Sequence, residues 1–152
     1  MRLLFVSHSL PPVGRPLANV GGMQRVATKL HDALECHPDV DLSSILLRST
    51  WRWIHLCTVP FLAKAGWQIY RKARREAVDV VLFSSMVTAA LAVPLRRVLA
   101  RHGVASAAIV HGLDVTLPFA PYQRFVPRIC DALDAVLPVS RATGEACVER
   151  GL

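Results

Sequence analysis

Two adjacent glycines precede an apolar helical pattern in the stretch VGGMQRVA, residues 20–27. A glycine at the start of a helix lets backbone N–H groups approach an anion without a Cβ in the way, and the helix dipole favours negative charge there. We therefore interpret Gly21 and Gly22 as a binding site for a phosphate group. Arg25, in the first turn, is either a further phosphate contact or a surface residue. The alternative for the glycine pair is a sharp turn from loop to helix.

A histidine and a carboxylate follow the apolar run SAAIVHG in the order HGLD, residues 111–114. Taken alone, His111 at the end of a strand is typical of a structural histidine that is hydrogen-bonded to nearby backbone. Asp114 taken alone fits a loop residue that bonds its own backbone. The chain has no G-x-x-x-x-G-K-[ST] motif, and Gly14 is too far from Gly21 for the turn of a dinucleotide site, which argues against a dehydrogenase.

Apolar runs alternate with helical patterns five times along the chain. We expect strands over 2–7, 40–47, 79–84, 106–112 and 135–140, with helices over 23–34, 58–76, 85–101, 121–133 and from 141 onwards. Pro94 should kink or split its helix. This alternation predicts a doubly wound, Rossmann-like α/β fold with a mainly parallel sheet, whose ligands bind at the carboxyl ends of the strands.

Polar residues that follow the predicted strands belong to that edge. We expect His8 to be a loop residue, and Ser84, Ser85 and Ser140 to be helix caps. The 152 residues, 53% of them hydrophobic, suit a single domain over 1–152. The opening MRLLFV is too short for a signal peptide and no apolar stretch is long enough to span a bilayer, so we expect a cytoplasmic protein. The four cysteines lie far apart and are expected to be buried thiols, with no metal site.

The positive charge is concentrated between Arg48 and Arg75, where seven Lys and Arg occur with no Asp or Glu and with all three tryptophans of the chain. One interpretation is a solvated helix face with core aromatics. A second is a patch for an anionic membrane surface, since Trp and Lys/Arg favour the headgroup region. Nucleic acid is not expected, because no binding signature accompanies the segment. The predicted contact residues are Trp51, Arg52, Trp53, Lys64, Arg71, Lys72, Arg74 and Arg75.

The order of these pieces resembles the N-terminal domain of family-4 retaining glycosyltransferases of the GT-B fold. The resemblance is carried by a first strand ending in SHSLPP, a loop closing with GGMQRVA, a strand ending in VHGLD, and VLPVSRATGEACVERGL near the end. It covers essentially the whole chain. The segment VGRPLAN lengthens the first loop beyond the family pattern, and a GT-B enzyme continues past residue 152 through another strand into a second, donor-holding domain.

The resemblance implies specific roles. Gly21 and Gly22 would face the phosphates or sugar of a nucleotide-sugar donor, His111 would contact the transferred sugar, and Asp114 would lie beside the reaction centre. Transfer would retain configuration without a metal or other cofactor, onto a sugar or lipid-linked acceptor, at the inner face of the membrane if the protein is peripheral. We expect this chain alone to be inactive without the donor-holding domain. The alternative function is a non-catalytic α/β module that binds an anionic surface or partner through residues 48–75.

Overall fold

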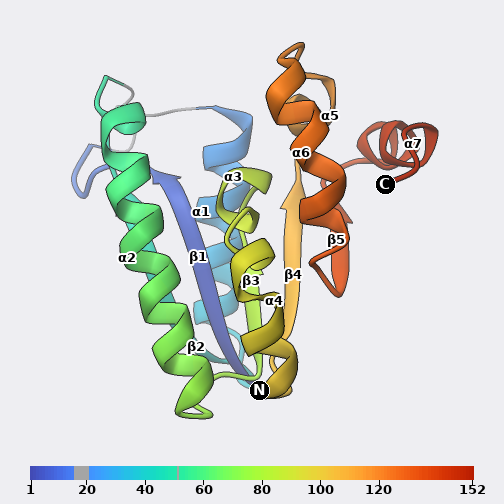
Figure 1. Cartoon of the computed structure of the whole chain (residues 1–152). Coiled ribbons are helices and arrows are strands. Elements are labelled where there is room, and N and C mark those ends of the chain that lie inside the picture. The colour runs from blue at the N-terminus through green and yellow to red at the C-terminus, as the bar shows by residue number, and fades with distance from the viewer. Residues whose placement is uncertain (16–20, 51) are drawn as a thin grey trace.

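The core of the protein is a five-stranded sheet whose strands are all parallel, in the order β2-β1-β3-β4-β5 (Figure 1). The computed structural model of the chain describes residues 1–15, 21–50 and 52–152. The strands are β1 (Arg2–Leu10), β2 (Asp41–Arg48), β3 (Val80–Phe83), β4 (Ala105–Val110) and β5 (Ala135–Pro138). All five strands overlap the ranges expected for them, but β1 continues to Leu10, beyond the expected range 2–7.

The central strands are buried on both faces, as continuous apolar runs in a parallel sheet should be. Leu4, Phe5 and Val6 of β1 have no exposed surface, and neither do Val81 and Phe83 of β3. The alternation of side chains divides the core in two. Leu4 and Val6 belong to the larger cluster and Phe5 to the smaller one on the opposite face of the sheet.

Helices cover both faces of this sheet, which confirms the doubly wound, Rossmann-like fold. Helix α1 (Gly22–Glu35) packs on the smaller core. The larger core lies under α2 (Ile54–Arg74), α3 (Met86–Ala89), α4 (Ala92–Arg101) and α6 (Ala120–Cys130). Two helices, α5 (Gly112–Thr116) and α7 (Arg141–Glu149), follow β4 and β5 and pack against each other. In Figure 1, α2, α4 and α6 lie in front of the sheet and α1 behind it.

The prolines divide the helices differently from what their positions predict. The helix expected over 85–101 is split into α3 and α4, as Pro94 suggests, but the break comes before Pro94. Pro94 is the third residue of α4, where its missing N–H would have no acceptor in the helix. Pro60 and Pro127 are tolerated inside α2 and α6, and α2 begins four residues earlier than expected, at Ile54.

The prediction that the cysteines are buried is wrong for three of the four. All are free thiols, but only Cys147 is buried, Cys57 and Cys130 are partly exposed, and Cys36 is exposed just after the last residue of α1. The pKa of the Cys147 thiol is raised, mainly by burial. Among the described residues, no helix combines the length and apolar character that crossing a bilayer requires.

An ion pair joins the amino ends of the two central strands. The Arg2 guanidinium donates from Nη2 to Asp79 Oδ1 at 2.5 Å, and the Arg2 backbone N–H donates to Asp79 Oδ2 at 2.7 Å. These bonds hold the pKa of Asp79 below its ordinary value. The carboxyl group therefore stays charged to lower pH in the folded protein than in the unfolded chain, which adds stability above its unfolded pKa.

We predict that Asp79→Asn destabilises the protein in a pH-dependent way. The difference in free energy of unfolding from the parent should be constant from about pH 7 to 5 and should disappear as the pH falls through the lowered pKa of Asp79, below about pH 4. Urea unfolding at a series of pH values measures this difference, with the exposed Asp39→Asn as control. A difference that does not change with pH would contradict the role of the ion pair.

Candidate functional site

The strands β1 and β3 are neighbours in the sheet, and the chain leaves their carboxyl ends in different directions. The helix that follows β1 lies on one face of the sheet, while the helices that follow β3 lie on the other. The chain therefore diverges at the ends of these two neighbouring strands. In doubly wound sheets this switch point is where ligands bind.

Buried polar side chains meet at this switch point. Ser84 Oγ donates to Ser7 Oγ at 2.9 Å, and Ser85 Oγ lies 3.4 Å from Nδ1 of His8. Ser7, Ser84 and Ser85 have no exposed surface, and His8 is 8% exposed. The expectation that His8 is a loop residue is therefore wrong, since it is a buried residue of β1. Hydroxyl and imidazole groups are common hydrogen-bonding partners for polar ligands.

The hydroxyl of Ser9, two residues after Ser7, differs from these groups in its hydrogen bonding. It is buried, yet Ser9 Oγ has no hydrogen-bond partner among the described residues. Ser9 lies where the pairing of β1 with β2 changes register, between Ser7 and Leu10. A buried hydroxyl without a partner costs about 1–3 kcal/mol. Ser9 is therefore a position at which a bound water or ligand would supply a missing hydrogen bond.

His111 belongs to the same edge and is tied to β3. It lies at the N-cap of α5, buried, and its Nε2 donates to the backbone oxygen of Ser84 at 3.0 Å. This contact agrees with the interpretation of His111, taken alone, as a structural histidine that is hydrogen-bonded to nearby backbone. The bond also connects His111, which follows β4, with Ser84, which follows β3 and bonds Ser7 of β1. Its contact with a sugar stays a prediction.

Asp114 is held within one turn of His111. Its Oδ2 accepts the His111 backbone N–H at 3.0 Å, and its Oδ1 accepts the Tyr122 hydroxyl at 3.1 Å. The Asp114 N–H in turn donates to the His111 oxygen, at 2.9 Å, so that the two residues close the first turn of α5. The pKa of Tyr122 is raised, first by burial and then by the charge of Asp114. The arrangement gives Asp114 a positioning role, while its place beside a reaction centre stays a prediction.

The glycine pair forms the start of α1, as the sequence predicts. Gly21 is the N-cap, with φ −145° and ψ 173°, and Gly22 is the first helical residue. Neither has a positive φ, so the backbone of this turn does not itself require glycine. A Cβ on Gly21 would meet the flexible side chain of Gln24, whereas a Cβ on Gly22 would meet nothing within 4 Å. Gly22 and Arg25 are both exposed.

The serines expected to be helix caps have three different roles. Ser140 is a cap, because its Oγ accepts the Thr143 N–H at 3.2 Å. Ser85 lies at the N-cap of α3 without capping it and contacts His8 instead. Ser84 is not a cap but bonds Ser7 across the sheet. The sequence pattern does not indicate Ser7 as a site residue, because it belongs to the run 2–7 that predicts a buried strand. Ser9 is expected in the loop that follows this run and is instead a buried residue of β1.

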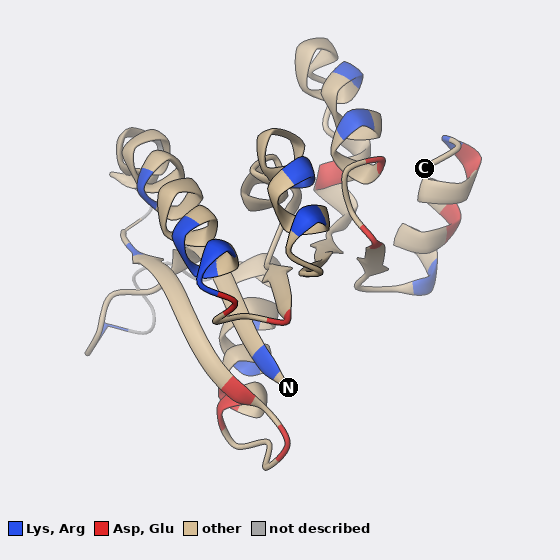
Figure 2. Ribbon diagram, turned by 60° about the horizontal axis from the view of Figure 1, so that its bottom comes forward, with Lys and Arg blue, Asp and Glu red and all other residues tan. Residues whose placement is uncertain are grey.

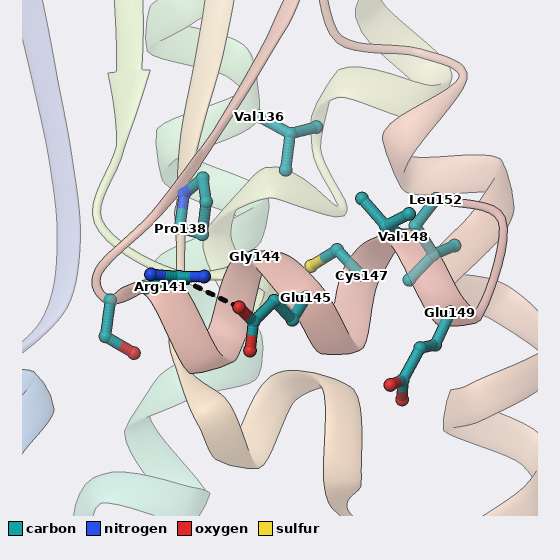
Figure 3. A pocket seen from close by; sticks show the side chains of 10 residues that line it. Val136, Pro138, Arg141, Gly144, Glu145, Cys147, Val148, Glu149 and Leu152 are labelled. Atoms are coloured by element: carbon teal, nitrogen blue, oxygen red, sulfur yellow. Dashed lines mark hydrogen bonds and ion pairs between the residues drawn. The ribbon is translucent and has the colours of Figure 1, made fainter.

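A wide groove of about 790 Å³ lies elsewhere, between β5 and α7. Figure 3 shows Val136 and Pro138 of β5 above Gly144, Cys147 and Val148 of α7, with Arg141 and Glu145 paired beside them. The lining is mainly apolar, and β5 is an edge strand of the sheet. The groove therefore lacks the converging polar groups of the switch point, and we place the candidate site at the switch point.

The basic segment is only partly as predicted. Arg52, Trp53, Lys64, Arg74 and Arg75 are exposed, and Arg71 is partly exposed with its guanidinium 4.5 Å from the centre of the Trp67 ring. Lys72, expected to contact a membrane or other anionic partner, instead donates to Ser43 Oγ of β2 at 3.3 Å, because it lies at the side of α2 that faces the sheet edge. Trp51 lies outside the described residues.

One group of possible metal ligands occurs in the described part of the chain. His31, Asp32 and Glu35 of α1 offer atoms within 4.8 Å of one another. The two carboxylates are exposed, and Nε2 of His31 lies 3.0 Å from Ser44 Oγ. Exposed acidic groups at this helical spacing are common on protein surfaces. We assign this group no role.

We predict that the bonds of Asp114 stabilise this edge measurably. Asp114→Asn replaces one acceptor oxygen by an amide and should lower the free energy of unfolding by about 1–3 kcal/mol. Tyr122→Phe removes only one of the two hydrogen bonds and should cost less, about 1 kcal/mol. Both are measured by urea unfolding at neutral pH. An Asp114→Asn protein as stable as the parent would contradict the positioning role.

No protein-family model matches this chain, and no curated protein matches it either. Evidence for the function therefore comes from the fold and from the groups that the fold brings together. These are the hydroxyls of Ser7 and Ser84 and the imidazole of His111, which hydrogen bonds join at the carboxyl ends of β1, β3 and β4 in a Rossmann-like sheet.

Proposed function

We propose that this chain is the acceptor-side half of a retaining glycosyltransferase that uses a nucleotide-sugar donor. One observation carries the proposal: hydrogen bonds join the buried residues Ser7, Ser84 and His111 at the carboxyl ends of β1, β3 and β4, and the helix α1 begins at the glycine pair. Hydroxyl groups suit sugar hydroxyls, and a helix start suits a phosphate. The resemblance to family-4 enzymes supports the same assignment.

The proposed roles follow from the contacts. The N–H groups in the first turn of α1 have no acceptor within the helix and would bind a donor phosphate, with Gly22 leaving room for it. The hydroxyl of Ser9, which has no hydrogen-bond partner in the described parts of the chain, would bond a sugar or phosphate oxygen. His111 would face the transferred sugar, held in place by Ser84 and Asp114.

The proposed reaction replaces one glycosidic bond by another on the same face of the sugar. The bond from the anomeric carbon to the donor phosphate breaks as a bond to the acceptor oxygen forms, through an oxocarbenium-like transition state. The leaving phosphate takes the acceptor proton. The protein then has to stabilise charge and position the two substrates, and no carboxylate nucleophile is required.

The free edge of β5 fits the proposed two-domain enzyme. Among the described strands, β5 pairs only with β4, and its apolar groove against α7 is open. An edge strand presents unpaired N–H and C=O groups, with which a further strand can pair. We propose that a strand leading into the donor-holding domain pairs here, as the family-4 resemblance implies.

We predict that this chain alone binds nucleotide-sugars with a dissociation constant no tighter than about 1 mM, and without turnover. The contacts available to a donor are a helix start and a few side chains, since the proposed donor-holding domain supplies the rest. NMR titration with uridine- and guanosine-diphosphate sugars should shift the amides of Gly22, Ser9 and Ser84. Gly103, at the opposite edge of the sheet, is the internal control.

Two outcomes of this titration would contradict the proposal. Shifts at Gly103 with none at the switch point would place the ligand elsewhere. A micromolar dissociation constant would mean that the donor site lies within this chain after all, which opposes the acceptor-side assignment.

We predict that Gly22→Val removes this binding and leaves the fold intact. A Cβ at residue 22 meets nothing within 4 Å, so the thermal transition should stay cooperative, while the side chain blocks the approach of a phosphate to the backbone. Gly66→Ala, in helix α2, is the control and should bind as the parent does. Unchanged binding by Gly22→Val, or loss of the cooperative transition, would contradict the proposal that a phosphate binds at the glycine pair.

A further inference from the structure

The helices on one face of the sheet form a layer that carries only positive charge. Helices α2, α4 and α6 contain nine Lys and Arg, four in α2, three in α4 and two in α6, and no Asp or Glu. The remaining residues of the chain contain nine basic and eleven acidic residues. Figure 2 shows basic segments along all three helices, which lie side by side in Figure 1. The folded protein therefore has a basic face wider than residues 48–75.

The arginines of α4 and α6 point away from the sheet. Arg96, Arg97 and Arg101 are exposed on α4, as are Arg124 and Arg128 on α6, while the opposite sides of both helices are buried. The other helices of comparable length differ, because α1 and α7 each carry both acidic and basic residues. The positive potential is thus specific to the layer that α2, α4 and α6 form, here called the basic layer.

Helix α2 adds an exposed apolar stripe to the basic layer. Trp53, Leu56, Val59 and Trp67 recur at helical spacing and are 57–72% exposed, whereas Ala65, Ile69 and Ala73 on the other side are fully buried. Lys64 and Arg74 border the stripe, and the guanidinium of Arg71 covers the Trp67 ring. Large apolar side chains exposed along one helix face mark an interaction surface.

We propose that the basic layer docks on an anionic lipid bilayer, with the apolar stripe of α2 lying in the headgroup region. Lys and Arg are attracted to anionic lipids, and Trp favours the boundary between headgroups and acyl chains. Leu56 and Val59 favour a bilayer over nucleic acid as the partner, because the apolar region of a bilayer can bury exposed aliphatic side chains. The inference rests on charge and exposure alone and does not depend on the proposed transferase.

The test uses the whole chain and vesicles of phosphatidylcholine with or without phosphatidylserine, in a co-sedimentation assay. We expect binding to the anionic vesicles only, and a strong decrease in binding between about 0.05 and 0.5 M salt. Arg97→Glu/Arg124→Glu reverses two charges of the layer outside residues 48–75 and should weaken binding at least about thirtyfold. Lys29→Glu/Arg141→Glu changes the net charge equally at exposed positions of α1 and α7 and should bind as the parent does.

A second variant tests the apolar stripe. Leu56→Ser/Trp67→Ala should weaken binding at least tenfold and should keep the parent's circular dichroism, because both side chains are exposed. Equal binding to both vesicle types, or equal loss in the two charge variants, would overturn the proposal. Binding to duplex DNA that survives Leu56→Ser/Trp67→Ala, with no vesicle binding, would identify a nucleic-acid surface instead. Neither assay contains a sugar donor, so failure here leaves the proposed transferase untouched.

Discussion

The parallel pairing of β1 with β3 is the constraint on which the rest of the structure depends. Val6 lies opposite Phe83 in the last paired position, and the Ser84 N–H donates to the Val6 oxygen at 2.9 Å. The next residue of each strand is therefore also opposite its partner, which is why Ser7 and Ser84 are in hydrogen-bond contact. The candidate site continues the register of the sheet beyond its last paired residues, and any slip of that register would separate its hydroxyl groups.

The same constraint fixes the polar groups of the candidate site relative to one another. Ser84 bonds Ser7 through its hydroxyl and His111 through its backbone oxygen, so one residue connects the ends of three strands. Asp114 fixes the backbone of His111 from the other side. Groups held in this way do not have to reorganise when charge develops nearby, which is the arrangement that catalysis by positioned dipoles needs. Ser9, the buried hydroxyl that the described residues leave without a partner, marks where the arrangement is incomplete.

Local patterns predicted the elements of this fold, while contacts between distant segments remained hidden. Buried strands and the break near Pro94 depend on neighbouring residues, and so does the cap formed by Ser140. The pairing of Ser7 with Ser84 depends on register across 77 positions, which no local pattern encodes. The direction of Lys72 depends likewise on how α2 lies against β2. No local pattern indicates the basic layer either, because its three helices are separated in sequence and become neighbours only in the fold.

The position of α2 relates the two proposals without making either depend on the other. Strand β2 ends at Arg48 and α2 begins at Ile54, so the first turns of α2 lie at the carboxyl edge of the sheet, the edge that holds the switch point (Figure 1). Trp53 and Leu56 are in this part of the helix. A bilayer on the basic layer would run along the strands, and its headgroups would reach the edge where Ser9 and His111 lie. An acceptor with an apolar anchor and a polar head could then keep its anchor in the bilayer while its head entered the site, which gives a physical reason for a membrane surface beside a sugar-transfer site.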